Sequence, residues 1–140
     1  MIYTASIDNC KDSTYQMVSI DSRIDRINNI GYYSSVMPSV SELNNWEDSE
    51  LIYQYYMNYL KALNIEKLIR DLDNCIIISS EEFYMISIRR ILADLLELKS
   101  KIKIPEIQVY KSNINKLYKP NNIKDELKKL IYSTEGIKYE

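Results

Sequence analysis

The sequence predicts a small α/β protein: a single three-layer domain with a mostly parallel sheet of about four strands covered by helices. Two observations lead to this prediction. Residues 75–78 (Cys-Ile-Ile-Ile) form a short apolar run without alternation, which indicates a strand buried on both faces. Helical patterns flank this run, and further short strand patterns lie along the chain. Such an order favours parallel pairing with right-handed crossovers.

Length and charge limit the possible architectures. With 140 residues there is room for one domain, 1–140, and 46% hydrophobic content is enough for an ordinary core. Residues 1–98 carry 8 basic and 15 acidic side chains, whereas residues 99–140 carry 10 lysines and 5 acids. We treat 111–140 as a lysine-rich helical extension. A pI near 5.3 argues against a dedicated nucleic-acid binder.

Composition excludes several chemistries. The chain has no histidine and only two cysteines, Cys10 and Cys75, so histidine-dependent nucleophilic catalysis is excluded, and neither a disulfide framework nor a zinc site is expected. We expect no cofactor and no bound metal. No window of 18 apolar residues occurs, and the N-terminus lacks a basic region followed by an apolar run. We therefore expect a cytoplasmic protein without membrane contact.

Two short strands are expected near the start of the chain. Residues 1–7 alternate in polarity, and residues 15–20 place Val18 and Ile20 on one face. Residues 8–14 between them are polar and rich in turn formers, so the chain has a point at which to turn.

Residues 21–45 form the least regular part of the sequence. We interpret them as a long loop, which in a compact domain is often functional. Within it the isoleucines of residues 24–30 fall three apart and could form a short helical turn. A short helix is expected to begin near Ser39 or Ser41.

Two helices are expected to bring the chain to the buried strand. Apolar and tyrosine side chains recur at three and four positions from residue 50 to residue 63, which predicts an amphipathic helix. Asn64 interrupts this pattern as a helix cap, and residues 65–72 continue as a second helix.

The helix that follows the strand has two possible starts. Ser79 with Glu82 three residues later could be a capping box. The better apolar stripe runs from residue 88 to residue 98, which favours a start near Ser87 and leaves 81–86 as a loop over the strand end.

One more strand and one more helix complete the prediction. Residues 105–110 (Pro-Glu-Ile-Gln-Val-Tyr) read as a strand, and residues 123–131 as a final helix. Asn121 or Asn122 would cap that helix, and Gly136 marks its end.

The candidate binding residues lie where buried strands end. In parallel sheets, ligands bind at the carboxyl ends of strands, near helix N-termini with unpaired N–H groups. Asp8 and Asp21, each just beyond a strand, could hold a metal with Glu81, but three carboxylates from separate loops are a weak signal. The candidate ligand-binding residues are Ser79, Glu81, Ser87 and Arg89, with Ser19 and Ser39 in second rank.

Several motifs in order resemble the family numbered 488 among the domains of unknown function, small bacterial and phage α/β proteins. In that family a buried strand ends Cys-Tyr-Glu, and Phe-Cys-His-Arg follows at a helix start. Here these patterns fall on residues 79–81 and 86–89. The resemblance spans roughly residues 1–110. Its earlier matches are residues 2–4, 18–20, 37–39, Trp46 and the tyrosine-rich stretch 53–72.

The departures from the family pattern affect its chemistry. Both family cysteines are serine here, at Ser79 and Ser87, and the family histidine is Ile88, whereas Glu81 and Arg89 match. If the family reaction depends on a thiolate or an imidazole, this chain lacks it, since a serine hydroxyl without a base is a poor nucleophile. The resemblance therefore implies a catalytically degenerate site that retains hydroxyls, one carboxylate and one guanidinium.

These residue types favour binding of a small anionic or nucleotide-like ligand at the strand ends, because a guanidinium suits carboxylates and phosphates. Two alternatives stay open. The chain could be an enzyme that uses Glu81 as acid or base. It could also be an interaction module or inhibitor, encoded by a mobile element, that docks on a protein partner through the lysine-rich C-terminal third.

Overall fold

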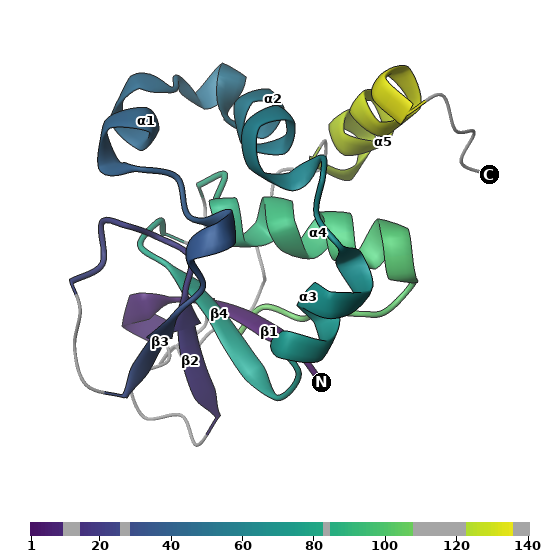
Figure 1. Ribbon diagram of the computed structural model, residues 1–140. Helices are drawn as coiled ribbons and strands as arrows, with labels where there is room; N and C mark the ends of the chain where they lie inside the picture. Colours follow the sequence, from purple (N-terminus) through teal and green to yellow (C-terminus); the bar gives the residue numbers. More distant parts are fainter. Residues whose placement is uncertain (10–14, 26–28, 83–84, 108–122, 136–140) are drawn as a thin grey trace, which may run out of the picture.

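The computed structural model describes residues 1–9, 15–25, 29–82, 85–107 and 123–135. These residues form a four-stranded sheet in which every neighbouring pair is parallel (Figure 1). The strand order is β1-β4-β2-β3. The predicted α/β class with a parallel sheet is therefore confirmed. The strands are β1 (Tyr3–Ser6), β2 (Gln16–Ser19), β3 (Ile30–Tyr32) and β4 (Cys75–Ser79).

The isoleucine run forms β4, which lies inside the sheet between β1 and β2. Ile76 is paired with Tyr3 on one side and with Met17 on the other. Ile77 packs into the larger core under the helices, whereas Ile76 and Ile78 pack into a smaller core on the opposite face. Both faces are apolar, which explains the absence of polar alternation in this strand.

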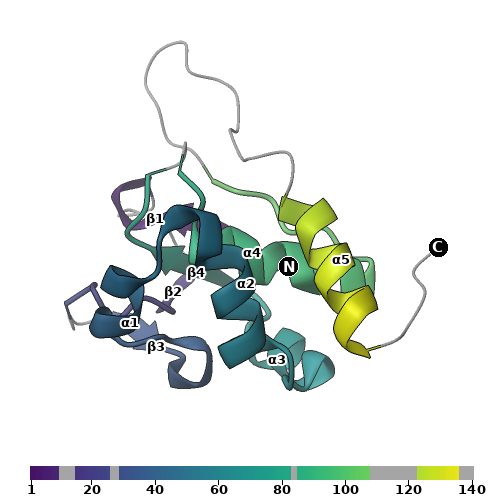
Figure 2. The same cartoon turned by 90° about the horizontal axis from the view of Figure 1, so that it is seen from above.

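The α-helices contribute to the larger of these two cores (Figures 1 and 2). The smaller core is covered by the short 3-10 helix Ile7–Asn9 and by the turn at Ile24. The layer on the α-helical face of the sheet is therefore much thicker than the layer on the opposite face. The helices are α1 (Val40–Asn45), α2 (Leu51–Tyr55), α3 (Ile65–Asp71), α4 (Ile88–Ser100) and α5 (Ile123–Glu135).

The interpretation of residues 21–45 as one long loop is wrong at β3. Ile30–Tyr32 pairs with β2, so the proposed helical turn over residues 24–30 is also wrong at Ile30. A three-residue strand is too short to show an alternating pattern in the sequence. Its start follows Asn29, which has a positive φ of 73° and so redirects the chain, a conformation that asparagine tolerates.

The strand predicted at residues 105–110 is described only at its start. Glu106 makes a single parallel bridge to Thr4 of β1. Thr4 N–H donates to the Pro105 carbonyl at 3.0 Å, and Ile107 N–H donates to the Thr4 carbonyl at 2.8 Å. The chain therefore runs along the outer edge of β1 here. Residues 108–110 lie outside the described part, as do Asn121, Asn122 and Gly136.

Helix starts follow the capping residues closely. Ser39 accepts from Glu42 N–H, Asn64 from Lys67 N–H and Ser87 from Arg90 N–H. The caps predicted at Asn64 and Ser87 are therefore confirmed. The alternative helix start at Ser79 is wrong, because that residue is still in β4.

The predicted helix over residues 50–63 is divided into two parts. α2 ends at Tyr55, and the next turn, Tyr56–Leu60, is π-helical. The Tyr55 hydroxyl is buried and donates to the Val36 carbonyl at 2.6 Å.

Among the described residues, no helix combines the length and apolar character that crossing a bilayer requires.

Replacing Ile77 by alanine should destabilise the fold by about 3 kcal/mol, because its fully buried side chain packs in the larger core and its loss leaves a cavity. The matched control is Val40→Ala at a side chain that is 43% exposed, where a change within about 0.5 kcal/mol is expected. Urea unfolding measures both free energies. Equal losses for the two variants would contradict the assigned position of β4.

Candidate functional site

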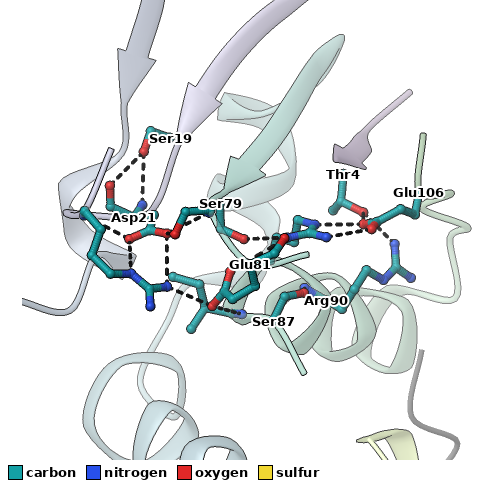
Figure 3. A network of polar contacts seen from close by, with 12 residues as sticks. Thr4, Ser19, Asp21, Ser79, Glu81, Ser87, Arg90 and Glu106 are labelled. Carbon is teal, nitrogen blue, oxygen red and sulfur yellow. Dashed lines mark hydrogen bonds and ion pairs between the residues drawn. The ribbon is translucent and has the colours of Figure 1, made fainter. Parts of the chain in front are cut away.

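Charged and polar side chains from five segments of the chain converge near the carboxyl edge of the sheet (Figure 3). β1 contributes Thr4, the segments after β2 and β4 contribute acids, α4 contributes two arginines in its first turn, and the segment after α4 contributes Glu106. We call this group the strand-end cluster. Its members are Thr4, Asp21, Arg23, Ser79, Ser80, Glu81, Arg89, Arg90, Asp94 and Glu106.

Arg89 is the central cation of the strand-end cluster, and it is only 1% exposed. Its Nε and Nη2 donate to the two carboxylate oxygens of Glu106 at 3.0 and 2.8 Å, a bidentate pair. Its Nη1 donates to Ser79 Oγ at 3.0 Å and to the Glu81 carbonyl at 2.8 Å. Four hydrogen bonds within the protein therefore hold this guanidinium, and little of it faces solvent.

Arg90 connects the start of α4 to β1 and to the segment that follows α4. Its Nη1 donates to Thr4 Oγ1 at 2.7 Å and to the Ile104 carbonyl at 2.8 Å, and its Nη2 donates to Asp94 at 3.2 Å. The Thr4 hydroxyl in turn donates to Glu106 at 2.7 Å. Two cations in the first turn of a helix are unfavourable for its dipole. The surrounding acceptors offset this cost.

Asp21 is fully buried and accepts from two directions. Its Oδ1 receives the Arg23 backbone N–H at 2.9 Å and Nε at 2.8 Å, while its Oδ2 receives the Ser80 N–H at 2.8 Å and hydroxyl at 2.6 Å. Burial alone would raise the pKa of Asp21, but the hydrogen bonds from Arg23 and Ser80 outweigh it and hold that pKa below its usual value.

Glu81 lies between two guanidinium groups. Its Oε2 accepts from Arg23 Nη2 at 3.0 Å and from the Ile88 backbone N–H at 3.2 Å. Its Oε1 lies 3.7 Å from Arg89 Nη1 and is buried without a hydrogen-bond partner among the described residues. This carboxylate occupies the N-terminus of α4, where a bound anion would otherwise be stabilised.

The structure brings together four of the six candidate residues. Arg89 contacts both Ser79 and Glu81, and Ser87 lies beside them as the cap of α4. Ser19 joins the same edge indirectly, because its Oγ accepts from Asp21 N–H at 3.0 Å and donates to the Asp21 carbonyl at 3.1 Å.

Ser39 does not belong to this group. It is exposed and caps α1, where its hydroxyl accepts from Glu42 N–H at 3.0 Å. The segment that leads to Ser39 does approach the same edge, because the Ser22 hydroxyl donates to the Pro38 carbonyl at 2.7 Å. The Ser39 hydroxyl itself is used as a helix cap.

Arg23 and Glu106 were missed by the sequence analysis. Arg23 lies two residues after Asp21, a spacing that allows the arginine to fold back on the carboxylate that precedes it. Glu106 belongs to the segment predicted as a strand, where parallel pairing beside β1 brings it to the same edge as β4. That position depends on long-range pairing, for which the local sequence carries no signal.

Asp8, Asp21 and Glu81, the three carboxylates considered for a metal site, do not come together as a group of ligands. In the described ranges no three carboxylate or thiol side chains are grouped as metal ligands. Asp21 and Glu81 instead share Arg23 as a common cation, with distances of 2.8 and 3.0 Å.

Comparison with family models, curated proteins and solved structures gives no match to this chain. The resemblance to the family numbered 488 therefore stays a prediction.

Stability should fall as the pH drops through the range in which the cluster carboxyl groups titrate. Burial would raise the pKa of Glu106, but hydrogen bonds from Arg89 and Thr4 and the nearby positive charge lower it. The pKa of Asp21 is also lowered, because its hydrogen bonds outweigh its burial. Because the pKa of each group is lower in the folded state, the unfolded chain takes up protons first as the pH falls. The stabilisation is therefore complete above the ordinary pKa values, 4.5 for Glu106 and 3.8 for Asp21, and it is lost as the pH falls below them.

This pH dependence is measured by urea unfolding between about pH 7 and pH 3. Glu106→Gln should lower stability at pH 7 by about 3 kcal/mol, because it leaves Arg89 buried without its anion, and its curve should fall less steeply in acid. Glu66→Gln, at an exposed glutamate on α3, is the control and should match the wild type. Identical acid slopes for Glu106→Gln and the wild type would contradict this account.

Proposed function

We propose that this protein binds a small anionic or nucleotide-like ligand at the carboxyl edge of its sheet, with Arg23 as the anion contact and with little or no catalysis. The observation that supports this proposal is the unequal exposure of the three cluster arginines. The Arg23 side chain is 31% exposed, compared with 1% for Arg89 and 7% for Arg90. Arg23 is therefore the cluster cation that a ligand in solvent can reach.

The position of Arg23 is fixed before any ligand arrives. Its Nε and Nη2 donate to the two oxygens of Asp21 at 2.8 and 3.0 Å, and Nη2 also reaches Glu81. Its Nη1 has no hydrogen-bond partner among the described residues. A guanidinium held in this way loses little conformational entropy on binding, which favours affinity.

The surrounding charge limits what this site can hold. The cluster contains four carboxylates and three guanidinium groups, a formal charge of −1. A ligand with one phosphate or carboxylate can pair with Arg23, whereas a ligand with several phosphates would be repelled more strongly by Asp21 and Glu81. A nucleoside monophosphate is a ligand with a single phosphate group.

Arg89, the ligand cation expected from the sequence, has a positioning role in this proposal. Its donors are directed to Glu106, Ser79 and the Glu81 carbonyl, so a ligand would have to displace internal partners to reach it. The enzyme alternative requires Glu81 to touch a substrate. However, its side chain is 6% exposed and accepts from Arg23 and from the start of α4.

We further propose that the chain is a divergent, catalytically degenerate member of the family numbered 488. In support, the four positions that carry the resemblance at the strand end, Ser79, Glu81, Ser87 and Arg89, lie side by side at one edge. Serine stands at the two positions where the family has cysteine, so a thiolate mechanism has no nucleophile here.

The interaction alternative has less support from the described part of the lysine-rich third. Lys99 pairs with Glu135 at 2.8 Å and Lys124 with Glu97 at 2.6 Å, so these two lysines hold α4 and α5 together. On α5, Ile123, Leu127 and Ile131 are fully buried in the larger core. Removing α5 would therefore expose the core as well as removing charge.

Calorimetric titration with adenosine monophosphate and with inorganic phosphate at low ionic strength tests this proposal. The wild type should bind at least one of them saturably, and Arg23→Met should weaken that binding about 10-fold or more through loss of a charged hydrogen bond. Arg70→Met, at an exposed arginine on α3, is the matched control and should bind normally.

Arg23→Lys separates charge from geometry, because lysine keeps the positive charge but lacks the planar guanidinium that can donate two parallel hydrogen bonds. Partial retention of affinity in this variant supports the proposal, provided that its thermal unfolding stays cooperative. Absence of saturation by both probes, or full binding by Arg23→Met, would overturn it.

A further inference from the structure

A second polar site lies between the end of β3 and α3, apart from the strand-end cluster. It is a pocket of about 300 Å³, at the small end of the range for ligand sites. The pocket shares no residue with the strand-end cluster. It is lined by Tyr32, Tyr33, Ser34, Ser35, Lys67 and Asp71. Four of these belong to the stretch 21–45, which the sequence had marked as a candidate functional segment.

The charged groups of this pocket are paired with each other. Asp71 Oδ2 accepts from Lys67 Nζ at 2.6 Å and from the Tyr33 hydroxyl at 2.7 Å. The hydrogen bonds from Lys67 and Tyr33 lower the pKa of Asp71, and the same carboxylate raises the pKa of Lys67. The lining residues thus present one cation and one anion, with a formal charge of zero.

The pairing leaves hydrogen-bonding capacity open to a ligand. The Lys67 side chain is 57% exposed and the Asp71 side chain 35% exposed, and an ammonium can donate three hydrogen bonds. Two tyrosines and two serines complete the lining, and a serine hydroxyl can both donate and accept. Groups that donate and groups that accept are therefore both present at this open pocket.

We infer that this pocket binds a neutral polyhydroxylated ligand, a monosaccharide or a sugar unit of a larger molecule. Vicinal hydroxyls can donate to a carboxylate and accept from an ammonium at the same time, so a sugar satisfies Asp71 and Lys67 together. The apolar face of a sugar ring also packs on aromatic side chains, and the Tyr33 side chain, whose hydroxyl is bonded to Asp71, lies at this site.

Charged ligands fit this pocket less well. An anion paired with Lys67 would meet the carboxylate of Asp71, and a cation paired with Asp71 would meet Lys67, so either would separate an ion pair that the protein already forms. A neutral ligand keeps that pair and adds to its hydrogen bonds.

NMR titration of the labelled protein with D-glucose, D-galactose and D-ribose tests this inference, with glycerol as a small polyol control. We expect saturable shift changes for at least one sugar, confined to the amides of Tyr33, Ser34, Ser35 and Lys67. Asp71→Asn should weaken that sugar's binding about 10-fold or more, because it removes a charged acceptor. Asp73→Asn, at an exposed aspartate two residues later, is the matched control.

Two further variants keep the result interpretable. Ser34→Leu fills the pocket from an exposed position and should abolish sugar binding, and Arg23→Met should leave sugar binding intact even if it abolishes phosphate binding. The inference is overturned if no sugar saturates, if glycerol gives the same response, or if Asp71→Asn and Asp73→Asn bind alike. Perturbation of these amides by inorganic phosphate alone would identify an anion site instead and would also overturn it.

Discussion

The buried ion pair between Arg89 and Glu106 is the constraint on which the strand-end cluster depends. Two charges that leave water each cost several kcal/mol, and this cost is recovered only if their hydrogen bonds are nearly complete. Arg89 meets this condition with four hydrogen bonds to three partners, two of them to Glu106. The first turn of α4 is therefore held against the edges of β1 and β4 by polar as well as apolar contacts.

This pair explains features of α4 that would otherwise be unfavourable. A helix N-terminus attracts anions, yet Arg89 and Arg90 stand in its first turn. Glu81 supplies the missing negative charge through its contact with Ile88 N–H, and Glu106 and Asp94 neutralise the arginines from the side. Of the three cluster arginines, Arg23 keeps the largest exposed fraction, and for that reason it carries the proposed ligand contact.

Local signals in the sequence were sufficient for much of the fold. The run 75–78 identified the inner strand, and Asn64 and Ser87 identified two helix starts, because strand burial and capping depend on neighbouring residues. β3 could not be predicted, because a strand of three residues is too short to show an alternation of apolar and polar side chains. At the site, Ser79, Glu81 and Arg89 follow from the end of β4, whereas Glu106 and Arg23 depend on contacts that only the folded chain creates.

The most direct test of the central claim is a double-mutant cycle on Arg89 and Glu106, with Arg89→Met, Glu106→Gln and the combined variant compared in urea unfolding at pH 7. We expect a coupling free energy of about 2 kcal/mol or more, since the pair is buried and bidentate. The same cycle on the exposed Lys67–Asp71 pair should give less than about 0.5 kcal/mol. A coupling for Arg89 and Glu106 as small as that of the surface pair would contradict the account.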